Sequence, residues 1–125
     1  MANRRCPCVT GLPYAECCGP LHDGATAAAT AEQLMRSRYS AFAVGDPDYL
    51  LATWHPSTRP PSLELDPGVR WVGLDVLATD GGGLLAADGT VEFTAHRIAD
   101  GERGAQHEVS RFVREQGAWR YLDAV

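Results

Sequence analysis

All four cysteines of this 125-residue chain lie within its first 18 residues, where their spacing is typical of a metal site. Four thiolates complete a tetrahedral Zn²⁺ site, and such a site can fold a segment too short to have its own core. The spacing therefore predicts a structural Zn²⁺ ion bound by Cys6, Cys8, Cys17 and Cys18. A redox or disulfide pair and buried free thiols are the alternatives. Four protein sulfurs leave no open position for water, which argues against catalytic zinc.

The residues around the cysteines favour tight turns. Pro7 fixes its own φ angle between the first two cysteines, and Gly11 supplies turn chemistry in the following loop. Cys17 and Cys18 can bind one ion if the backbone bends between them, whereas a disulfide between neighbours would be strained. His22 could replace one cysteine as a ligand, and the alternative is a surface-loop histidine.

A charged side chain interrupts the apolar face of the helix expected over residues 31–44. Arg38 lies in the middle of the face formed by Ala31, Leu34, Met35, Tyr39 and Phe42, while Arg36, Ser37 and Ser40 point elsewhere. A buried charge is costly unless it is paired. We expect Arg38 to pair with a sheet carboxylate, for which Glu92, Glu108 and Asp123 are candidates. An arginine that binds an anionic ligand and one that reaches solvent are the alternatives.

Four further side chains could line a pocket together with Arg38: Tyr39, Trp54, His55 and Glu92. His55 could act as a general base near neutral pH, and the alternative is a histidine that anchors a loop. The chain has no lysine, which excludes Schiff-base chemistry and a Walker-type phosphate site. No nucleophile and base have a spacing that periodicity brings together, so we expect no catalytic turnover.

The elements that must position these residues are two helices followed by four strands. A capping box at Thr30 and Gln33 starts the first helix, which ends at Gly45, and Asp46-Pro47 starts a short second helix. Residues 56–68 contain four prolines and form an irregular connection. Strands are expected at 69–79, 90–99, 106–115 and 118–123, with the second and third joined through 99–105. This order predicts an α+β fold, with helices on one face of a curved antiparallel sheet.

The pattern of the third strand does not decide which of its faces points inward. Val109 and Val113 favour one face and Phe112 favours the other. The last two strands are expected to pair through a turn at Gln116-Gly117.

Composition limits the function classes. The formal net charge of −5 argues against nucleic-acid binding, including binding through Arg4 and Arg5, because nucleic acids require a basic surface. No apolar run is long enough to span a bilayer, so we expect no membrane partner. We expect a cytoplasmic protein, since clustered thiols in a reducing compartment are more often metal ligands than disulfides.

Residues 6–20, with the sequence CPCVTGLPYAECCGP, resemble the SEC-C motif, the zinc-binding tail of the preprotein-translocase motor SecA. In that motif the four positions occupied here by cysteine are the zinc ligands. The chain departs from the motif at Val9-Thr10, where Gly-Ser is usual. Residues 34–42, 49–58 and 110–115 extend the resemblance to the YchJ-like family, in which a SEC-C knuckle precedes a domain similar to nuclear transport factor 2.

The resemblance implies a zinc knuckle at residues 1–22 and a cone-shaped, cystatin-like α+β domain at 23–125. The family lends no established activity. By analogy the knuckle suggests a protein partner, such as translocation or ribosome-associated machinery. We expect a small cytoplasmic zinc-binding protein that serves as a protein-interaction or ligand-binding module. The alternative is an isomerase- or dehydratase-like enzyme that uses a pocket of the α+β domain.

Overall fold

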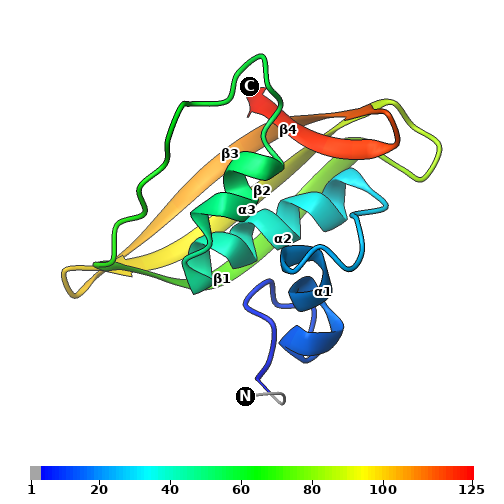
Figure 1. Cartoon of the computed structure of the whole chain (residues 1–125). Coiled ribbons are helices and arrows are strands. Elements are labelled where there is room, and N and C mark those ends of the chain that lie inside the picture. Colours follow the sequence, from blue (N-terminus) through cyan, green and yellow to red (C-terminus); the bar gives the residue numbers. More distant parts are fainter. Residues whose placement is uncertain (1–3) are drawn as a thin grey trace.

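Helices come first and strands follow in the computed structural model, which describes residues 4–125 (Figure 1). The elements are a 3-10 turn η1 (Tyr14–Glu16), α1 (Cys18–His22), α2 (Ala31–Val44), α3 (Pro47–Ala52), β1 (Val69–Gly81), β2 (Asp88–Ala99), β3 (Glu102–Glu115) and β4 (Ala118–Ala124). The predicted α+β class is confirmed. No helix within residues 4–125 is long and apolar enough to cross a membrane.

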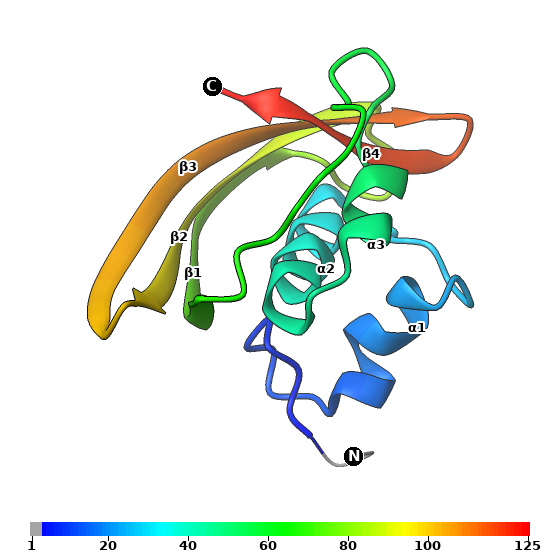
Figure 2. The ribbon, with the colours of Figure 1, turned by 60° about the vertical axis from the view of Figure 1, so that its left-hand side comes forward.

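The four strands form one antiparallel sheet in the order β1-β2-β3-β4, and it curves around α2 and α3 (Figure 2). Two-residue turns join the last three strands. Asp100 and Gly101 have φ angles of 53° and 77°, and Gln116 and Gly117 have 54° and 80°. Positive φ at both central residues is typical of type I′ turns, whose twist matches that of the flanking strands.

The expected connection over residues 99–105 is therefore wrong. Ala99 pairs directly with Glu102, so β2 and β3 are both longer than the hydrophobic pattern indicated. The cause is that the ends of this hairpin carry polar residues on both faces, which hide the strand period.

The inward face of β3 is the one that carries Phe112. Phe112 and Ser110 are buried, whereas Val109 lies on the other side of the strand. The core between this face and α2 also includes Leu34, Met35, Leu74, Val91, Ala95 and Trp119.

Helix α2 begins and ends as the sequence predicted. The Thr30 hydroxyl accepts a hydrogen bond from the Gln33 N–H at 3.1 Å, and Gly45 ends the helix with a φ of 79°. The Gln33 side chain differs slightly from a capping box, because it accepts from the N–H of Ala29, one residue before the cap.

A second face of α2 is buried against the knuckle, which comprises residues 4–22 of the described chain and lies on the side of α2 away from the sheet (Figure 2). Ser37 and Ser40 are fully buried there. Arg36 donates from Nη1 to the Cys8 carbonyl oxygen at 2.7 Å. Helix α2 therefore forms a wall shared by the knuckle and the sheet domain.

Candidate functional site

The four cysteine sulfurs meet between the knuckle loop and the first turn of α1. Their Sγ atoms all lie within 4.8 Å of one another. The Sγ atoms of Cys8 and Cys17 are 3.5 Å apart, and those of Cys17 and Cys18 are 4.0 Å apart. These neighbours face one point because the backbone bends at Cys17, which has φ −127° and ψ −101°. All four cysteines are free thiols.

This arrangement fits a tetrahedral metal ion. Sulfurs bound to one zinc ion at ~2.3 Å lie about 3.8 Å apart. The Cys8–Cys17 and Cys17–Cys18 separations of 3.5 and 4.0 Å bracket that value. Cys6, Cys8 and Cys18 are buried, so water has little access to the centre of the cluster. The four cysteines could therefore hold a metal ion whose ligands all come from the protein.

The electrostatics of the cluster favour a thiolate at Cys6. Hydrogen bonds from the Cys18 and Cys8 thiols hold the pKa of Cys6 well below its usual value. The hydrogen bond with Cys6, and to a smaller extent that with Cys8, raises the pKa of Cys18, so Cys18 favours its protonated form. A thiolate is the form of cysteine that binds a metal ion.

His22 is not one of the ligands and is not a surface-loop residue. It is the last residue of α1, where its Nδ1 accepts from the Tyr14 hydroxyl at 2.5 Å and its Nε2 donates to the Ser37 carbonyl oxygen at 2.8 Å. The ring also lies against Tyr49, with centroids 4.6 Å apart. His22 therefore joins the knuckle to α2 and α3.

A cavity of about 290 Å³ lies on the opposite side of α2, between this helix and the concave face of the sheet. Aromatic rings form most of its wall: Tyr39, Phe42, Trp54, Trp71, Phe93, Phe112 and Tyr121. The polar side chains of the wall are Arg38, Gln106, Glu108 and Ser110. An apolar chamber with a few converging polar groups is the usual form of a small-molecule site.

Arg38 is the buried cation of this cavity, with 7% of its surface exposed. Its Nη1 donates to the Leu50 carbonyl oxygen and to the Thr53 hydroxyl, both at 2.7 Å. Its Cζ lies 5.1 Å from the centre of the Trp54 ring and 4.6 Å from that of Tyr121. Burial lowers the pKa of Arg38 to about 10, and Tyr121 acts in the opposite direction. The guanidinium therefore remains charged at neutral pH.

The predicted ion pair between Arg38 and a sheet carboxylate is wrong. Among residues 4–125 no carboxylate lies within ion-pair distance of Arg38. Glu92 pairs with His107 and Asp123 pairs with Arg111, in both cases at solvent-exposed positions. Glu108 lies in the same cavity and acts on the Arg38 pKa only at longer range. A backbone carbonyl, a hydroxyl and two aromatic rings take the place of the expected acid.

A backbone bridge places the two rings beside Arg38. The His55 N–H donates to the Tyr121 carbonyl oxygen, and the Tyr121 N–H donates to the Thr53 carbonyl oxygen, each at 2.8 Å. This parallel bridge brings Trp54 next to Tyr121, with ring centroids 5.1 Å apart. The segment after α3 is therefore fixed to β4, although 66 positions separate Tyr121 from His55 (121 − 55).

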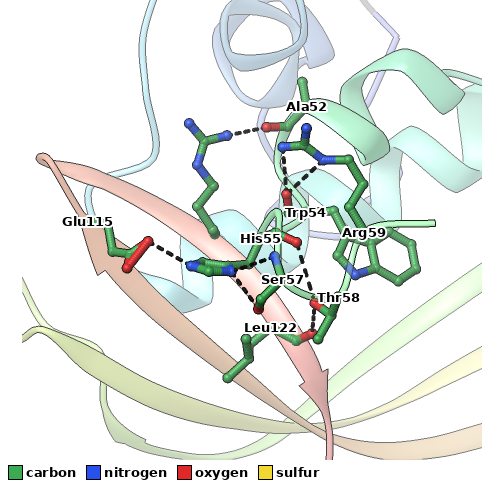
Figure 3. Close-up of polar contacts among 9 residues, drawn as sticks. Ala52, Trp54, His55, Ser57, Thr58, Arg59, Glu115 and Leu122 are labelled. Carbon is green, nitrogen blue, oxygen red and sulfur yellow. Dashed lines mark hydrogen bonds and ion pairs between the residues drawn. The ribbon is translucent and has the colours of Figure 1, made fainter. Parts of the chain in front are cut away.

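Three of the five residues expected in a pocket lie in the wall of this cavity: Arg38, Tyr39 and Trp54. The structure places His55 elsewhere, in the polar cluster of Figure 3. Its Nε2 contacts Glu115 Oε1 at 2.6 Å, and its Nδ1 contacts Ser57 Oγ at 2.8 Å. Nearby, Thr58 donates to the Leu122 carbonyl oxygen at 2.6 Å. His55 therefore anchors the irregular connection to β3 and β4, which was the alternative interpretation.

Glu92 also lies outside the cavity. Residues alternate between the two faces of β2, and Val91, Phe93 and Ala95 face inward. Glu92 therefore faces outward, where its Oε2 lies 2.7 Å from His107 Nε2.

The sequence did not indicate that Glu108 and Tyr121 line the pocket. Glu108 lies four residues before Phe112, so the two share a strand face once Phe112 is known to point inward. Tyr121 shares its face with the buried Trp119 by the same alternation. Ser110 donates a hydrogen bond to Glu108 Oε2. Tyr39 is fixed as well, because its hydroxyl accepts the Gly73 N–H at 3.0 Å.

Comparisons with known proteins agree with this arrangement. The profile described as "YchJ, middle NTF2-like domain" matches residues 30–124. The UPF0225 protein of Streptomyces coelicolor is 53% identical, covering 98% of this chain and 96% of the relative. That of Chromobacterium violaceum is 49% identical, covering 99% and 94%.

Two solved structures are similar over nearly the whole chain. A SEC-C motif-containing protein from Rhodopseudomonas palustris superposes with a TM-score of 0.83 at 34% identity, covering 96% of each chain. A second, from Psychrobacter arcticus, gives 0.80 at 33% identity, covering 98% of this chain and 82% of the other. The chain therefore belongs to the UPF0225, or YchJ-like, family, in which a SEC-C cysteine motif precedes an NTF2-like domain.

Proposed function

We propose that this protein is a small-molecule-binding protein whose fold is supported by a structural Zn²⁺ ion. The observation that carries this proposal is the cavity of about 290 Å³, which is lined by aromatic rings and by the buried guanidinium of Arg38. A core with only a structural role has little reason to keep a charged side chain beside open space, since the charge is costly to bury. The apolar wall supplies affinity, and the few polar groups orient the ligand.

The ligand site can be tested with a neutral aromatic probe. We expect indole, titrated into ¹⁵N-labelled protein, to shift the side-chain N–H signals of Trp54 and Trp71, which line the cavity. The signal of Trp119 is an internal control, because its Nε1 donates to the Ala29 carbonyl oxygen outside the cavity. Unchanged signals of Trp54 and Trp71 at saturating indole would contradict the proposal.

A matched pair of variants on β3 locates the binding. Gln106 lines the cavity, and the next residue, His107, faces outward. We expect Gln106→Trp to weaken indole binding and His107→Trp to leave it unchanged. Equal effects of the two substitutions would place the binding outside the cavity.

We propose zinc as the metal of the cysteine cluster, held by Cys6, Cys8, Cys17 and Cys18. Support comes from four free thiols whose Sγ atoms lie within 4.8 Å of one another and from the SEC-C motif. The bound ion supplies no reaction chemistry, because the protein occupies all four ligand positions. Unpaired thiols also support a cytoplasmic location. Elemental analysis of the purified protein should give one zinc per chain and none after Cys18→Ser, and a metal-free protein with paired disulfides would contradict this.

We further propose that the knuckle contacts a protein partner. Val9 and Leu12 present apolar side chains that are 52% and 49% exposed on the loop between the ligand pairs. A photo-reactive residue at position 12 should give cross-links in cells, with translocation or ribosome-associated proteins as the first candidates by analogy. Position 85 is the matched control, since Leu85 is 99% exposed on another loop. The same products from both positions would contradict a specific contact.

An isomerase-like activity is the second candidate, and Glu108 is the observation that favours it. This carboxylate faces an apolar cavity that also holds Tyr39 and Tyr121, which is the set that proton abstraction beside a carbonyl requires. The test is deuterium exchange at that carbon in a panel of ketones, followed by NMR. Exchange that is lost in Glu108→Gln would establish the activity, and no exchange above buffer would exclude it for those ketones.

A further inference from the structure

The guanidinium of Arg38 is fixed at one nitrogen and free at two. Only Nη1 hydrogen-bonds to the protein, where Leu50 and Thr53 accept from it. Across residues 4–125, Nε and Nη2 have no hydrogen-bond acceptor, and both remain accessible to a water-sized probe. Arg38 lines the cavity, so a ligand there lies next to a guanidinium with two nitrogens still available. An arginine with one anchored and two free nitrogens is preorganised to bind an acceptor.

A second donor lacks a partner beside Arg38. The indole Nε1 of Trp54 is buried and has no hydrogen-bond acceptor among residues 4–125. Its ring centre lies 5.1 Å from Cζ of Arg38, and both residues line the cavity. This nitrogen is closed off even from a water-sized probe. Arg38 is therefore the donor that an acceptor in the cavity can reach directly, whereas the Trp54 N–H becomes available only if its ring moves.

We propose that the cavity binds a small organic monocarboxylate, whose carboxylate contacts Arg38 and whose apolar body lies among the aromatic rings of the wall. This inference rests on the proposed ligand-binding function and names the class of ligand. A carboxylate offers two oxygens to the forked guanidinium, which is the geometry that arginine recognises best. The cavity of about 290 Å³ holds about ten water-sized groups, at roughly 30 Å³ each. The ligand is therefore of the size of phenylacetate.

Glu108 selects a single negative charge. Its carboxylate lies in the same cavity and hydrogen-bonds to Ser110, so it repels an anion placed beside Arg38. For a phosphate dianion the attraction to Arg38 and the repulsion by Glu108 both double and largely offset each other, whereas the cost of taking the ion out of water grows with the square of its charge. A monoester phosphate of similar size should therefore bind more weakly than the carboxylate.

The experiment uses the zinc-loaded full chain and three probes of similar shape: phenylacetate, neutral phenylacetamide and phenylphosphate. Affinities are read from the indole N–H signals of Trp54 and Trp71, with Trp119 as control. We expect phenylacetate to bind at least about tenfold more tightly than phenylacetamide, as a charge-assisted contact to arginine implies. We also expect it to bind more tightly than phenylphosphate.

Two isosteric substitutions should act in opposite directions. Arg38→Gln removes the cation and should abolish the preference for phenylacetate over phenylacetamide. Glu108→Gln removes the repulsion and should tighten phenylacetate binding without changing that of phenylacetamide. A purely structural disturbance would weaken both probes in both variants. Arg111→Gln is the control, because Arg111 pairs with Asp123 at an exposed site.

Each outcome decides one of the two proposals. Equal affinities for phenylacetate and phenylacetamide would overturn the carboxylate class and leave the ligand site intact. Tighter binding of phenylphosphate would also overturn it, in favour of phosphate. Binding of none of the probes, together with silence toward indole, would overturn the ligand site itself. If Arg38→Gln does not fold, the comparison of the three probes on the unaltered protein still decides the class.

Discussion

Arg38 and Val9 are two residues at which the fold tolerates a local cost. Arg38 is a charge among aromatic rings with no acid beside it. Val9 is a β-branched residue with a φ of 60°, in the left-handed region that favours glycine. In both cases another side chain would avoid this local free-energy cost, so a substitution at each position tests it directly.

We expect Arg38→Met at pH 7 to lower the free energy of unfolding by about 1–2 kcal/mol. The substitution leaves the Leu50 carbonyl without its donor but also removes a buried charge. A buried ion pair broken at the same position would instead cost about 3–5 kcal/mol. Urea unfolding of both proteins checks the difference, and a loss in the larger range would show that Arg38 is structural.

The same pair of proteins has a predictable pH dependence. The folded-state pKa of Arg38 is about 10, below its ordinary 12.5, so the unfolded chain binds this proton more tightly. The shift destabilises the wild type by about 3 kcal/mol below pH 10, and this cost disappears as the pH rises from about 10 toward 12.5. Stability of the wild type relative to Arg38→Met should therefore rise over that range. A difference that stays constant would contradict the shift.

Val9→Gly should strengthen the metal-bound knuckle. A left-handed backbone costs a residue with a Cβ about 1–2 kcal/mol, and the SEC-C motif usually has glycine here. Competition with a zinc chelator should show about fivefold tighter retention, which corresponds to about 1 kcal/mol. Val72→Gly is the control, because Val72 is exposed on β1 without a positive φ, and it should lower stability. Weaker zinc retention in Val9→Gly would contradict the strain.

At the scale of the element, the β2–β3 hairpin depends on its turn. Gly101 has a φ of 77°, so we expect Gly101→Ala to lower the free energy of unfolding by about 1 kcal/mol. Gly83→Ala is the matched control, since Gly83 has no positive φ and free space around the added Cβ. Thermal unfolding of the two variants measures the difference, and equal melting temperatures would argue against a type I′ turn.

The elements were largely predictable because their signals are local. Thr30 and Gly45 delimit α2 by capping chemistry, and alternation with turn residues delimits the strands. Docking of the knuckle was not predictable. Ser37 and Ser40 are small polar residues that suggest a solvent-facing side, yet both are buried against the knuckle. The knuckle reaches this face of α2 only through tertiary packing, for which the local sequence of the helix carries no signal.

The candidate sites divide in the same way. The four cysteines that could hold a metal ion are close in sequence, so their spacing alone indicated that they would cluster. The cavity is assembled from distant segments. Which side chains line it depends on the alternation of residues between the two faces of each strand. Glu92 faces outward while Glu108 faces inward, a distinction that the ambiguous pattern of β3 concealed. The His55 side chain lies outside the cavity. Its contribution comes from its backbone, because the His55 N–H bonds to Tyr121 and so holds Trp54 beside Tyr121.

At the scale of the whole molecule, removal of the metal should affect α2 as well as the knuckle. Besides disorder up to about Gly19, we expect shifted amide signals at Ser40, whose Oγ lies 3.6 Å from Cys6 Sγ, and at Ser37, whose carbonyl oxygen accepts from His22. Amides of β2 should keep their positions, because the sheet core lies on the other side of α2. Proton–nitrogen NMR spectra with and without chelator show the boundary. Loss of dispersion throughout the sheet would mean that the metal supports the entire fold.

The bridge between Trp54 and Tyr121 also sets an order of events during synthesis. The cysteine cluster is complete once Cys18 has been made, whereas β4 begins 100 residues later (118 − 18). At the usual elongation rates this interval is roughly 5 to 20 s. A nascent chain can therefore have all four cysteines in place before β4, which brings Tyr121 to Trp54 and Arg38, has been made. The cluster that could hold a metal is thus complete early in synthesis, and the wall of the cavity is completed among the last steps.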